Sequence, residues 1–477
     1  INISLDPKYF AENILSISKD LKSFGKNTHD AGKKVMVEHT DPNPFKIFHI
    51  GHLMANTIGE SLSRLVEFSG ADVVRACYQG DVGLHVAKTL WAVGKNPEDM
   101  TIEYLGKMYV LGSEKYEEDE SAKKEIISIN KKIFEKSDPE INTLYEKGRK
   151  LSLEYFDAIY AKLGSRFDRF FFESEVADAG KAIVLKFLEQ GVFEKSQGAI
   201  IFPGEKHGLH NRVFINSEGL PTYEAKEIGL TARKFELYPD MSESVIVTAN
   251  EQSDYFKVLL KTLSLIAPEH ASRMKHIAHG LLRPSSGKMS SRKGNIVPAE
   301  TMLEEIESLV AEKMKERDFG AEELASIRKD VAVSALKYSI LRQAIGGDII
   351  YDPEKSVSFE GDSGPYLQYA CVRAGAVVAK AGVSEEVKTF PETVEPLEKL
   401  LARFPEVVER SRLEYAPHYI VTYLIELAGA FNSYYTIHKI IDEKDPLSPY
   451  RVLLTETFAG VLKNGLWILG IEVPKRM

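Results

Sequence analysis

Cysteine, tryptophan and long apolar runs are scarce in this chain of 477 residues, which has 2 cysteines and 2 tryptophans. Cys77 and Cys371 lie far apart in the sequence, so neither a disulfide framework nor a cysteine-ligated zinc site is expected. No apolar run approaches the ~20 residues that a membrane-spanning helix needs. Internal repeats and low-complexity tracts are also absent from the sequence. These absences argue against a disulfide-rich secreted protein, a membrane-spanning protein and a repeat protein.

The start of the chain has neither the pattern of a secretory signal peptide nor an initiator methionine. A cytoplasmic protein is therefore expected. With 44% hydrophobic and 27% charged residues, the composition is that of a soluble globular protein. The length suggests roughly two to four domains.

Charge is unevenly distributed along the chain. The net charge of −9 does not by itself indicate a nucleic-acid partner. Residues 271–300 are an exception, because they hold six basic residues against Glu300 alone. A local basic patch attracts phosphate even on an acidic protein, since salt screens the more distant charges. A solvated charged surface is the alternative explanation for such a cluster.

Residues 33–83 have the pattern of a strand, a helix and a second strand. The apolar runs 35–37 and 73–77 flank a helical stretch that begins after His49. This order favours a parallel sheet and an α/β domain of Rossmann type. Residues 90–165 are highly charged and helical in pattern, which indicates a largely helical insertion between the halves of the sheet.

Further along the chain, we expect strands at 199–203, 211–215 and 245–248, and a helix from about Ser253. From about Ala321, apolar residues recur at helical spacing in the segments 331–341, 366–380, 396–413, 417–431 and 451–469. The predicted organisation is a helical lead-in at 1–25, an α/β domain at 26–320 with an insertion at about 86–205, and an all-α helical bundle at 321–477.

The first motif that indicates chemistry is Phe48-His49-Ile50-Gly51-His52, which follows a predicted strand and opens a helix. His49 and His52 are three positions apart and should share one face of the first helical turn. Gly51 has no side chain, which leaves room for a base or ribose near the backbone. A helix N-terminus attracts phosphate, so this turn is suited to a triphosphate.

The second motif is Gly287-Lys288-Met289-Ser290-Ser291-Arg292-Lys293-Gly294-Asn295, in the basic segment. Such a cationic loop would close over pyrophosphate and offset the charge that grows in a transition state. Lys46, three residues before His49, would add a cation from the other side. No covalent nucleophile is evident nearby, so the pattern favours in-line attack on phosphorus, catalysed by positioning and charge stabilisation. Either motif alone is weak, but the ordered pair is specific.

The two motifs resemble the HIGH and KMSKS motifs of class I aminoacyl-tRNA synthetases, and the surrounding residues resemble the arginyl-tRNA synthetases in particular. The segments that carry this resemblance cover essentially the whole chain: Val37-Glu38-His39-Thr40-Asp41-Pro42-Asn43, Gly80-Asp81-Val82-Gly83, residues 163–168, residues 219–223, residues 359–369 and Pro474-Lys475-Arg476-Met477. The resemblance implies that the α/β domain is catalytic and that the helical bundle binds the anticodon.

The resemblance also implies a two-step reaction. The arginine carboxylate attacks the α-phosphorus of ATP, with Mg²⁺ assisting, and gives arginyl-adenylate and pyrophosphate. The 2′-hydroxyl of the terminal adenosine of tRNA(Arg) then accepts the arginyl group. The expected partners are arginine, ATP and tRNA(Arg), and we expect a monomer with no metal site of its own and no membrane contact.

Site residues follow from the resemblance by position. The implied catalytic residues are Lys46, His49, His52, Lys288 and Arg292. The implied ATP site comprises His49, Gly51, His52, Gly280, Lys288, Met289 and Ser290. The implied arginine pocket comprises Glu38, Asn43, Tyr223, Glu227 and Gln252. A guanidinium is a rigid fork of donors that a sheltered carboxylate matches best, and Glu227, one helical turn after Tyr223, is the expected partner.

The chain departs from the family pattern at four points, one of which is Val82 in place of a frequent tryptophan. Glu227 stands where the family usually has aspartate, and Ser291 stands at the second lysine of KMSKS, where Lys46 is expected to substitute. The family normally carries an extra N-terminal domain that grips the tRNA, and this chain begins where that domain would end.

The end of the helical bundle is the expected tRNA contact, with Tyr434, Tyr435 and Met477 as candidates. Aromatic faces next to cations suit unstacked bases, although two adjacent tyrosines are more often part of a core. Two other functions stay open at this point: a non-catalytic synthetase relative that binds tRNA or a partner, and another HIGH-type nucleotidyltransferase. The helical last third argues against the second, and the intact His49, His52 and Lys288 argue against the first.

Overall fold

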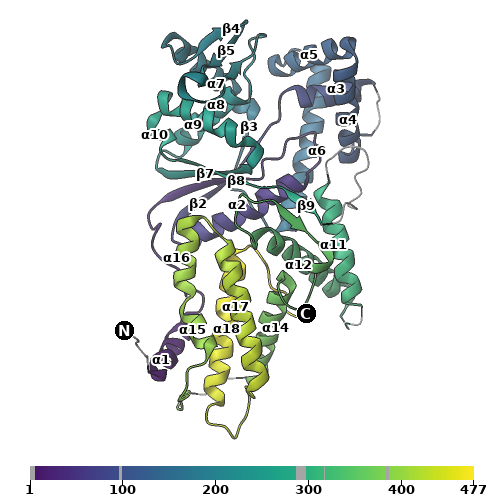
Figure 1. The fold of residues 1–477 in the computed structure, drawn as a ribbon. Coiled ribbons are helices and arrows are strands. Elements are labelled where there is room, and N and C mark those ends of the chain that lie inside the picture. The colour runs from purple at the N-terminus through teal and green to yellow at the C-terminus, as the bar shows by residue number, and fades with distance from the viewer. Residues whose placement is uncertain (1–5, 96–98, 286–296, 316, 318, 383–385) are drawn as a thin grey trace. The chain divides into compact units, whose positions relative to one another are not determined.

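The computed structural model describes residues 6–95, 99–285, 297–315, 317, 319–382 and 386–477. The chain divides into two compact units, each of which combines segments that are distant in sequence. We call residues 34–59 and 73–279 the sheet unit, and residues 1–33, 60–72 and 280–477 the helical unit. Figure 1 labels the elements of both.

A five-stranded sheet with the order β3-β2-β1-β7-β8 forms the centre of the sheet unit. Its strands are β1 (Lys34–Glu38), β2 (Asp72–Gln79), β3 (Arg169–Phe172), β7 (Met241–Ala249) and β8 (Met274–His279). The β1–β7, β7–β8 and β2–β3 pairs are parallel, as the βαβ pattern predicted. The strand order runs outward in opposite directions from β1 and β7, so their carboxyl ends form a topological switch point, where ligands of α/β sheets bind.

Helix α2 (Ile50–Phe68) follows β1 at this point and begins where the sequence predicted. Its apolar residues recur at helical spacing, and Leu53, Leu62 and Leu65 are fully buried. The first part of α2 belongs to the sheet unit and its later part, from Glu60, to the helical unit.

Four helices follow β2: α3 (Leu84–Lys95), α4 (Ile102–Glu118), α5 (Glu120–Glu135) and α6 (Pro139–Leu163). Figure 1 shows them gathered in one cluster. Thr101, Asp119 and Asp138 cap α4, α5 and α6 by accepting hydrogen bonds from backbone N–H groups of their first turns. Their shared core includes Leu90, Leu105, Ile126 and Ile133, so this stretch is largely helical, as expected.

The predicted insertion at about 86–205 is not continuous, because β3 returns to the central sheet and pairs with β2. A run of only four residues, with aromatic side chains and no alternation, does not identify a strand by pattern. A second excursion then follows, with α7 (Glu173–Glu189) and the antiparallel strands β4 (Glu194–Ser196), β5 (Ala199–Phe202) and β6 (Arg212–Ile215). The strands expected at 199–203 and 211–215 are thereby confirmed.

Helix α8 (Tyr223–Leu237) packs on α7 at very short range because glycines face each other. A Cβ on Gly180 would lie 1.9 Å from the carbonyl oxygen of Ala225, and one on Gly229 would lie 2.2 Å from that of Val176. This packing sets the position of α8. The 3-10 turns at Gly204–His207 and Asn250–Gln252 and the helices α9 (Ser253–Ile266) and α10 (Pro268–Ala271) complete the unit.

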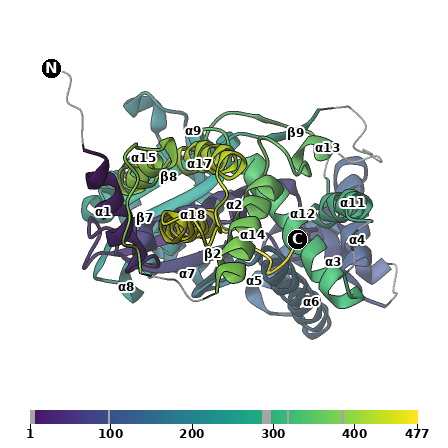
Figure 2. The same ribbon diagram turned by 90° about the horizontal axis from the view of Figure 1, so that it is seen from below.

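The helical unit contains α1 (Pro7–Ser18), α11 (Ala299–Lys313), α12 (Ala321–Leu341), α13 (Pro353–Ser356), α14 (Gly364–Ala381), α15 (Pro396–Ala402), α16 (Phe404–Glu414), α17 (His418–Ile437) and α18 (Ser448–Ile468). The view of Figure 2 looks along α17 and α18, which pack on each other. The predicted bundle is confirmed, but the short parallel pair β9 (Leu282–Pro284) and β10 (Ile349–Tyr351) was not expected. Among the described residues, no helix is long and apolar enough to cross a membrane.

Candidate active site

A cavity of about 530 Å³ opens at the carboxyl ends of β1 and β7, within the sheet unit. It lies at the switch point where the strand order predicts a ligand crevice. Its lining includes six acidic residues and three histidines: Glu38, Asp41, Glu173, Glu224, Glu227 and Glu251, with His49, His52 and His279. A cavity of this size and composition suits a small cationic ligand next to an anionic one.

Eight of the residues named from the sequence meet in this cavity: Glu38, Asn43, His49, Gly51, His52, Tyr223, Glu227 and Gln252. Lys46 and Gly280 are not in its lining. Gly280 belongs to the helical unit, where a Cβ would lie 2.2 Å from the carbonyl oxygen of Gly347, so close packing explains this glycine. Lys288, Met289, Ser290 and Arg292 lie outside the described residues.

The two histidines stack at the start of α2, with ring centroids 3.6 Å apart. The backbone N–H of His49 donates to Nδ1 of His52 at 3.2 Å, and that of Gly51 donates to Nδ1 of His49 at 3.1 Å. Because Nδ1 is the acceptor in both rings, each neutral imidazole carries its proton on Nε2. The rings therefore cap the helix and present N–H donors in place of two backbone N–H groups.

Both imidazoles are held in the neutral form. Burial, helped by the charge of Lys46, lowers the pKa of His49 to about 4. Burial also lowers the pKa of His52 well below its usual range, and the neighbouring His49 and Lys46 add to the effect. At neutral pH this end of the cavity therefore offers neutral hydrogen-bond donors.

The loop between β1 and α2 has a strained backbone. Thr40, Asp41 and Phe45 have positive φ values of 81°, 45° and 67°, which side chains other than glycine rarely adopt. The backbone N–H of Tyr78 donates to Oδ1 of Asp41 at 2.7 Å and so holds this turn to β2. The loop is thereby fixed against the neighbouring strand.

A buried polar chain supports the same loop from below. Nδ2 of Asn56 donates to Oγ1 of Thr40 at 3.1 Å, and Oγ of Ser165 donates to Oδ1 of Asn56 at 2.7 Å. The backbone N–H of Gly80 donates to Oδ1 of Asn43 at 3.0 Å. These bonds tie the strained residues to α2 and to the segment after α6, as strained functional loops require.

The acidic end of the cavity contains more carboxylates than internal cations. Nζ of Lys234 lies 2.8 Å from Glu38, although the angles of this ion pair fall outside hydrogen-bond geometry. Glu227 is buried, and its Oε1 atom has no hydrogen-bond partner among the described residues. Burial and the charge of Glu38 raise the pKa of Glu227 to about 8. Burial and Glu38 also raise the pKa of Asp41 well above its usual range.

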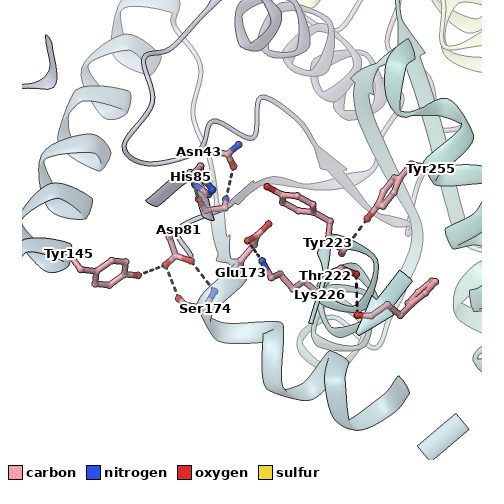
Figure 3. Close-up of polar contacts among 12 residues, drawn as sticks. Asn43, Asp81, His85, Tyr145, Glu173, Ser174, Thr222, Tyr223, Lys226 and Tyr255 are labelled. Carbon is pink, nitrogen blue, oxygen red and sulfur yellow. Dashed lines mark hydrogen bonds and ion pairs between the residues drawn. The ribbon is translucent and has the colours of Figure 1, made fainter. Parts of the chain in front are cut away.

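Glu173 is paired inside the protein, and Figure 3 shows it facing Lys226 of α8. Nζ of Lys226 donates to Oε2 of Glu173 at 2.6 Å, and both residues are buried. The neighbouring Asp81 accepts hydrogen bonds from Oγ of Ser174 at 2.7 Å and from the Tyr145 hydroxyl at 3.2 Å. This network fixes the start of α7, and with it Glu173, at the cavity wall.

The charged residues that were missed from the sequence include Asp41, Glu173, Glu224, Lys226, Lys234 and Glu251. Asp41 stands inside the recognised motif, and Lys226 precedes Glu227, so both were within reach of the same pattern. Glu173 directly follows β3, and an acid at the carboxyl end of a parallel strand is a signal, but this strand was not predicted. Lys234 carries no local signal.

The residues expected to bind tRNA lie in the helical unit. Tyr434 is only 5% exposed, so its ring is part of the helical core and has no free face for a base. One of two adjacent tyrosines often packs inside the protein, and here it is Tyr434. The prediction that Tyr434 contacts tRNA is therefore wrong. Tyr435 is 39% exposed, and the guanidinium of Arg373 lies 5.5 Å from its ring. Met477 lines a separate cavity of about 670 Å³ with Arg476.

Comparison with known proteins adds to this geometry. The family model for tRNA synthetases class I (R), catalytic domain, matches residues 13–352, and that for the DALR anticodon binding domain matches 367–477. An arginine–tRNA ligase of Treponema denticola is 31% identical over 98% of this chain and 83% of its own length. One of Flavobacterium psychrophilum is 29% identical over 100% and 85%.

Solved structures have the same fold. The arginyl-tRNA synthetase of Thermus thermophilus superposes with a TM-score of 0.83 at 23% identity, covering 100% of this chain and 87% of the other. The methionyl-tRNA synthetase of Mycobacterium tuberculosis in complex with methionyl-adenylate gives a TM-score of 0.59 at 14% identity, with 93% and 92% covered.

Proposed function

The chain belongs to the class I tRNA synthetases for arginine, and on that premise we propose that its cavity binds arginine at the acidic end and ATP at the histidine end. The protein acts as an arginine–tRNA ligase. One observation carries the proposal for the cavity. The same cavity is lined by Glu227, which has a buried oxygen without a hydrogen-bond partner among the described residues, and by the stacked rings of His49 and His52.

The acidic end is suited to a guanidinium. Glu227 is the proposed partner, because a buried carboxylate oxygen without a donor is costly until a ligand supplies one. Glu38, Asn43, Tyr223 and Gln252 complete this proposed subsite. Lys234 sits against Glu38 and offsets part of the acidic charge, which leaves Glu227 as the carboxylate with the greatest need of a cation.

The histidine end is suited to the phosphates of ATP. The Nε2–H groups of His49 and His52 are donors that need no protonation change, and Gly51 between them keeps the approach open. Preorganised donors of this kind stabilise charge that develops on phosphate oxygens. The arginine carboxylate, held by the rest of the pocket, would then attack the α-phosphorus in line.

Class I synthetases generally use ATP together with Mg²⁺. In the part of the chain that the structure describes, no cluster of three or more histidine, cysteine or acidic residues could hold a metal ion. We propose that the ion enters with the nucleotide, where it would neutralise charge on the phosphates.

The partner implied by the second family match is tRNA, since residues 367–477 match a DALR anticodon binding domain. Tyr435 and Met477 stay predictions as contact residues, as do Lys288, Met289, Ser290, Arg292 and Gly280 for ATP. The monomeric state and the cytoplasmic location also stay predictions.

Arginine-dependent ATP–pyrophosphate exchange, run with and without tRNA(Arg), tests the proposal. We expect exchange that requires arginine and that citrulline does not support. Citrulline has the shape of arginine without its charge. Exchange with citrulline at the same efficiency would contradict the guanidinium site. No exchange in either condition, with ATP still bound, would indicate a non-catalytic relative.

A further inference from the structure

Lys46 is a half-buried lysine whose neighbour is an aromatic ring. Its Nζ atom lies 4.9 Å from the centroid of Tyr109 on α4. None of the ion pairs formed by the described residues includes Lys46. We propose that Tyr109 is a positioning residue, which holds the Lys46 ammonium ready for the triphosphate of ATP. This inference rests on the proposed function.

Lys46 precedes His49 by three residues, in the loop that leads into α2, which places its backbone next to the nucleotide end. Its charge contributes to the lowered pKa of His49 and of His52, after burial in each case. The ammonium group is thus close to the two rings that present Nε2–H donors. A cation and two neutral donors at one end of a cavity form a site for a polyanion.

The backbone around Lys46 is clamped by α4 and α6. A Cβ on Gly106 of α4 would lie 2.6 Å from Cδ1 of Ile47, so the helix packs closely on this segment at a residue without a side chain. Gly106 and Tyr109 are three positions apart and share a helix face, so the same approach places the Tyr109 ring at Lys46.

Helix α6 holds the other side of the same segment. A Cβ on Gly148 would lie 2.3 Å from the ring of Phe45, and Oγ of Ser152 accepts the backbone N–H of Phe45 at 2.9 Å. The residues on both sides of Lys46 are therefore each packed against a helix of the 84–163 cluster. These helices therefore shape the loop that carries Lys46.

A ring is better suited than a carboxylate to hold a cation that has to act on phosphate. A carboxylate would neutralise the ammonium and compete with the nucleotide, whereas a ring face attracts a cation and leaves its charge in place. The ring also limits the rotamers of the flexible lysine side chain. The site thereby avoids the entropy cost of ordering that side chain when the ligand binds.

The test is pyrophosphate exchange by the full chain with tRNA(Arg), with the kinetic constants for ATP and for arginine measured separately. Tyr109→Leu removes the ring, Tyr109→Phe keeps it, and Tyr109→Met fills the volume without a ring if the leucine variant does not fold. Tyr116→Leu is the matched control, because Tyr116 lies on the same helix with a different lysine, Lys88, 4.3 Å from its ring.

We expect Tyr109→Leu to lower kcat/KM for ATP about three- to ten-fold and to leave the KM of arginine unchanged. Tyr109→Phe and Tyr116→Leu should match the wild type. In a Lys46→Gln background, Tyr109→Leu should have no further effect, because the group that it positions is gone.

Three results would overturn the inference. They are wild-type ATP kinetics in Tyr109→Leu, an undiminished effect of Tyr109→Leu in the Lys46→Gln background, and wild-type kinetics in Lys46→Gln itself. In each of these cases the wild-type chain still activates arginine, so the proposed function stands. A wild-type chain that shows no exchange would instead overturn the proposed function, and this inference with it.

Discussion

Burial shifts the pKa in opposite directions at the two ends of the cavity, and in both cases it favours the neutral form of the side chain. Burial raises the pKa of Glu227 to about 8 and lowers the pKa of His49 to about 4. In both cases the low-dielectric environment disfavours the charged form, which is the protonated form of a histidine and the ionised form of an acid. An empty cavity at neutral pH therefore has neutral histidines at one end and a largely protonated Glu227 at the other.

The difference lies in what each end must do when a ligand binds. An imidazole that already presents Nε2–H can bind phosphate without a proton change, whereas a protonated glutamic acid must lose its proton to pair with a guanidinium. The acidic end should therefore control the affinity for arginine and its pH dependence. The histidine end should control the rate of activation. The predictions below, from the largest expected effect to the smallest, test this division.

Glu227→Gln should raise the KM of arginine on the order of 10²- to 10³-fold, because loss of one partner of a buried charge pair costs ~2–5 kcal/mol. The KM of ATP should change little. Kinetics of pyrophosphate exchange at saturating concentrations of the other substrate measure both constants. Glu236→Gln, an exposed acid on the same helix, is the control. An unaltered arginine dependence would remove Glu227 from the pocket.

His52→Ala should slow adenylate formation on the order of 10²-fold, as the loss of a preorganised donor to a transition state does. The KM of arginine should stay within about twofold, on the order of what a distant substitution does. Single-turnover formation of adenylate measures the rate, and His29→Ala, at an exposed histidine, serves as the control. If arginine affinity falls as much as the rate, the two ends are not separable.

The KM of arginine should fall as the pH rises from 6 to 8, by at most about tenfold per pH unit. The sign follows from linkage: Glu227 is protonated in the empty cavity below its pKa of about 8 and ionised in the complex, so binding releases a proton. Above about pH 8 the effect should level off. The KM of ATP should not follow this trend, because His49, with a pKa of about 4, stays neutral throughout.

The pH dependence of the arginine KM in Glu227→Gln separates the titration of Glu227 from other causes. That variant lacks the titrating group, so its arginine KM should show no slope between pH 6 and 8. A slope that persists would assign the proton to Asp41, whose pKa is also raised by burial.

Ser165→Ala should have the smallest effect and should alter both ends together. The Ser165 hydroxyl donates to Asn56, which supports the strained Thr40, so its loss should lower the free energy of unfolding by about 1 kcal/mol. Thermal unfolding measures the stability change. We expect the kinetic constants for ATP and arginine to shift in parallel, and a change in only one of them would contradict a shared support.

Much of the site could be predicted because its motifs are local. The spacing of His49 and His52 places them on one turn of any helix, whereas Glu38 and Asn43 were identified by the resemblance to the family. The helical bundle was readable from apolar periodicity. The short strand β3 was not, because four residues provide too little pattern, and with it the role of Glu173 at the cavity wall was missed.

The sequence by itself determined the βαβ start of the sheet, the apolar helices of the bundle, the histidine turn and the family, because each is carried by residues close together in the chain. The tertiary structure alone decided which charges meet: Lys234 with Glu38, Lys226 with Glu173, and Lys46 with the ring of Tyr109. These partners are tens to hundreds of positions apart. Their contacts depend on strand order and on glycines that allow helices to approach, such as Gly106 and Gly180. Local periodicity records neither of these, because it describes the faces of an element and not the neighbour that covers them.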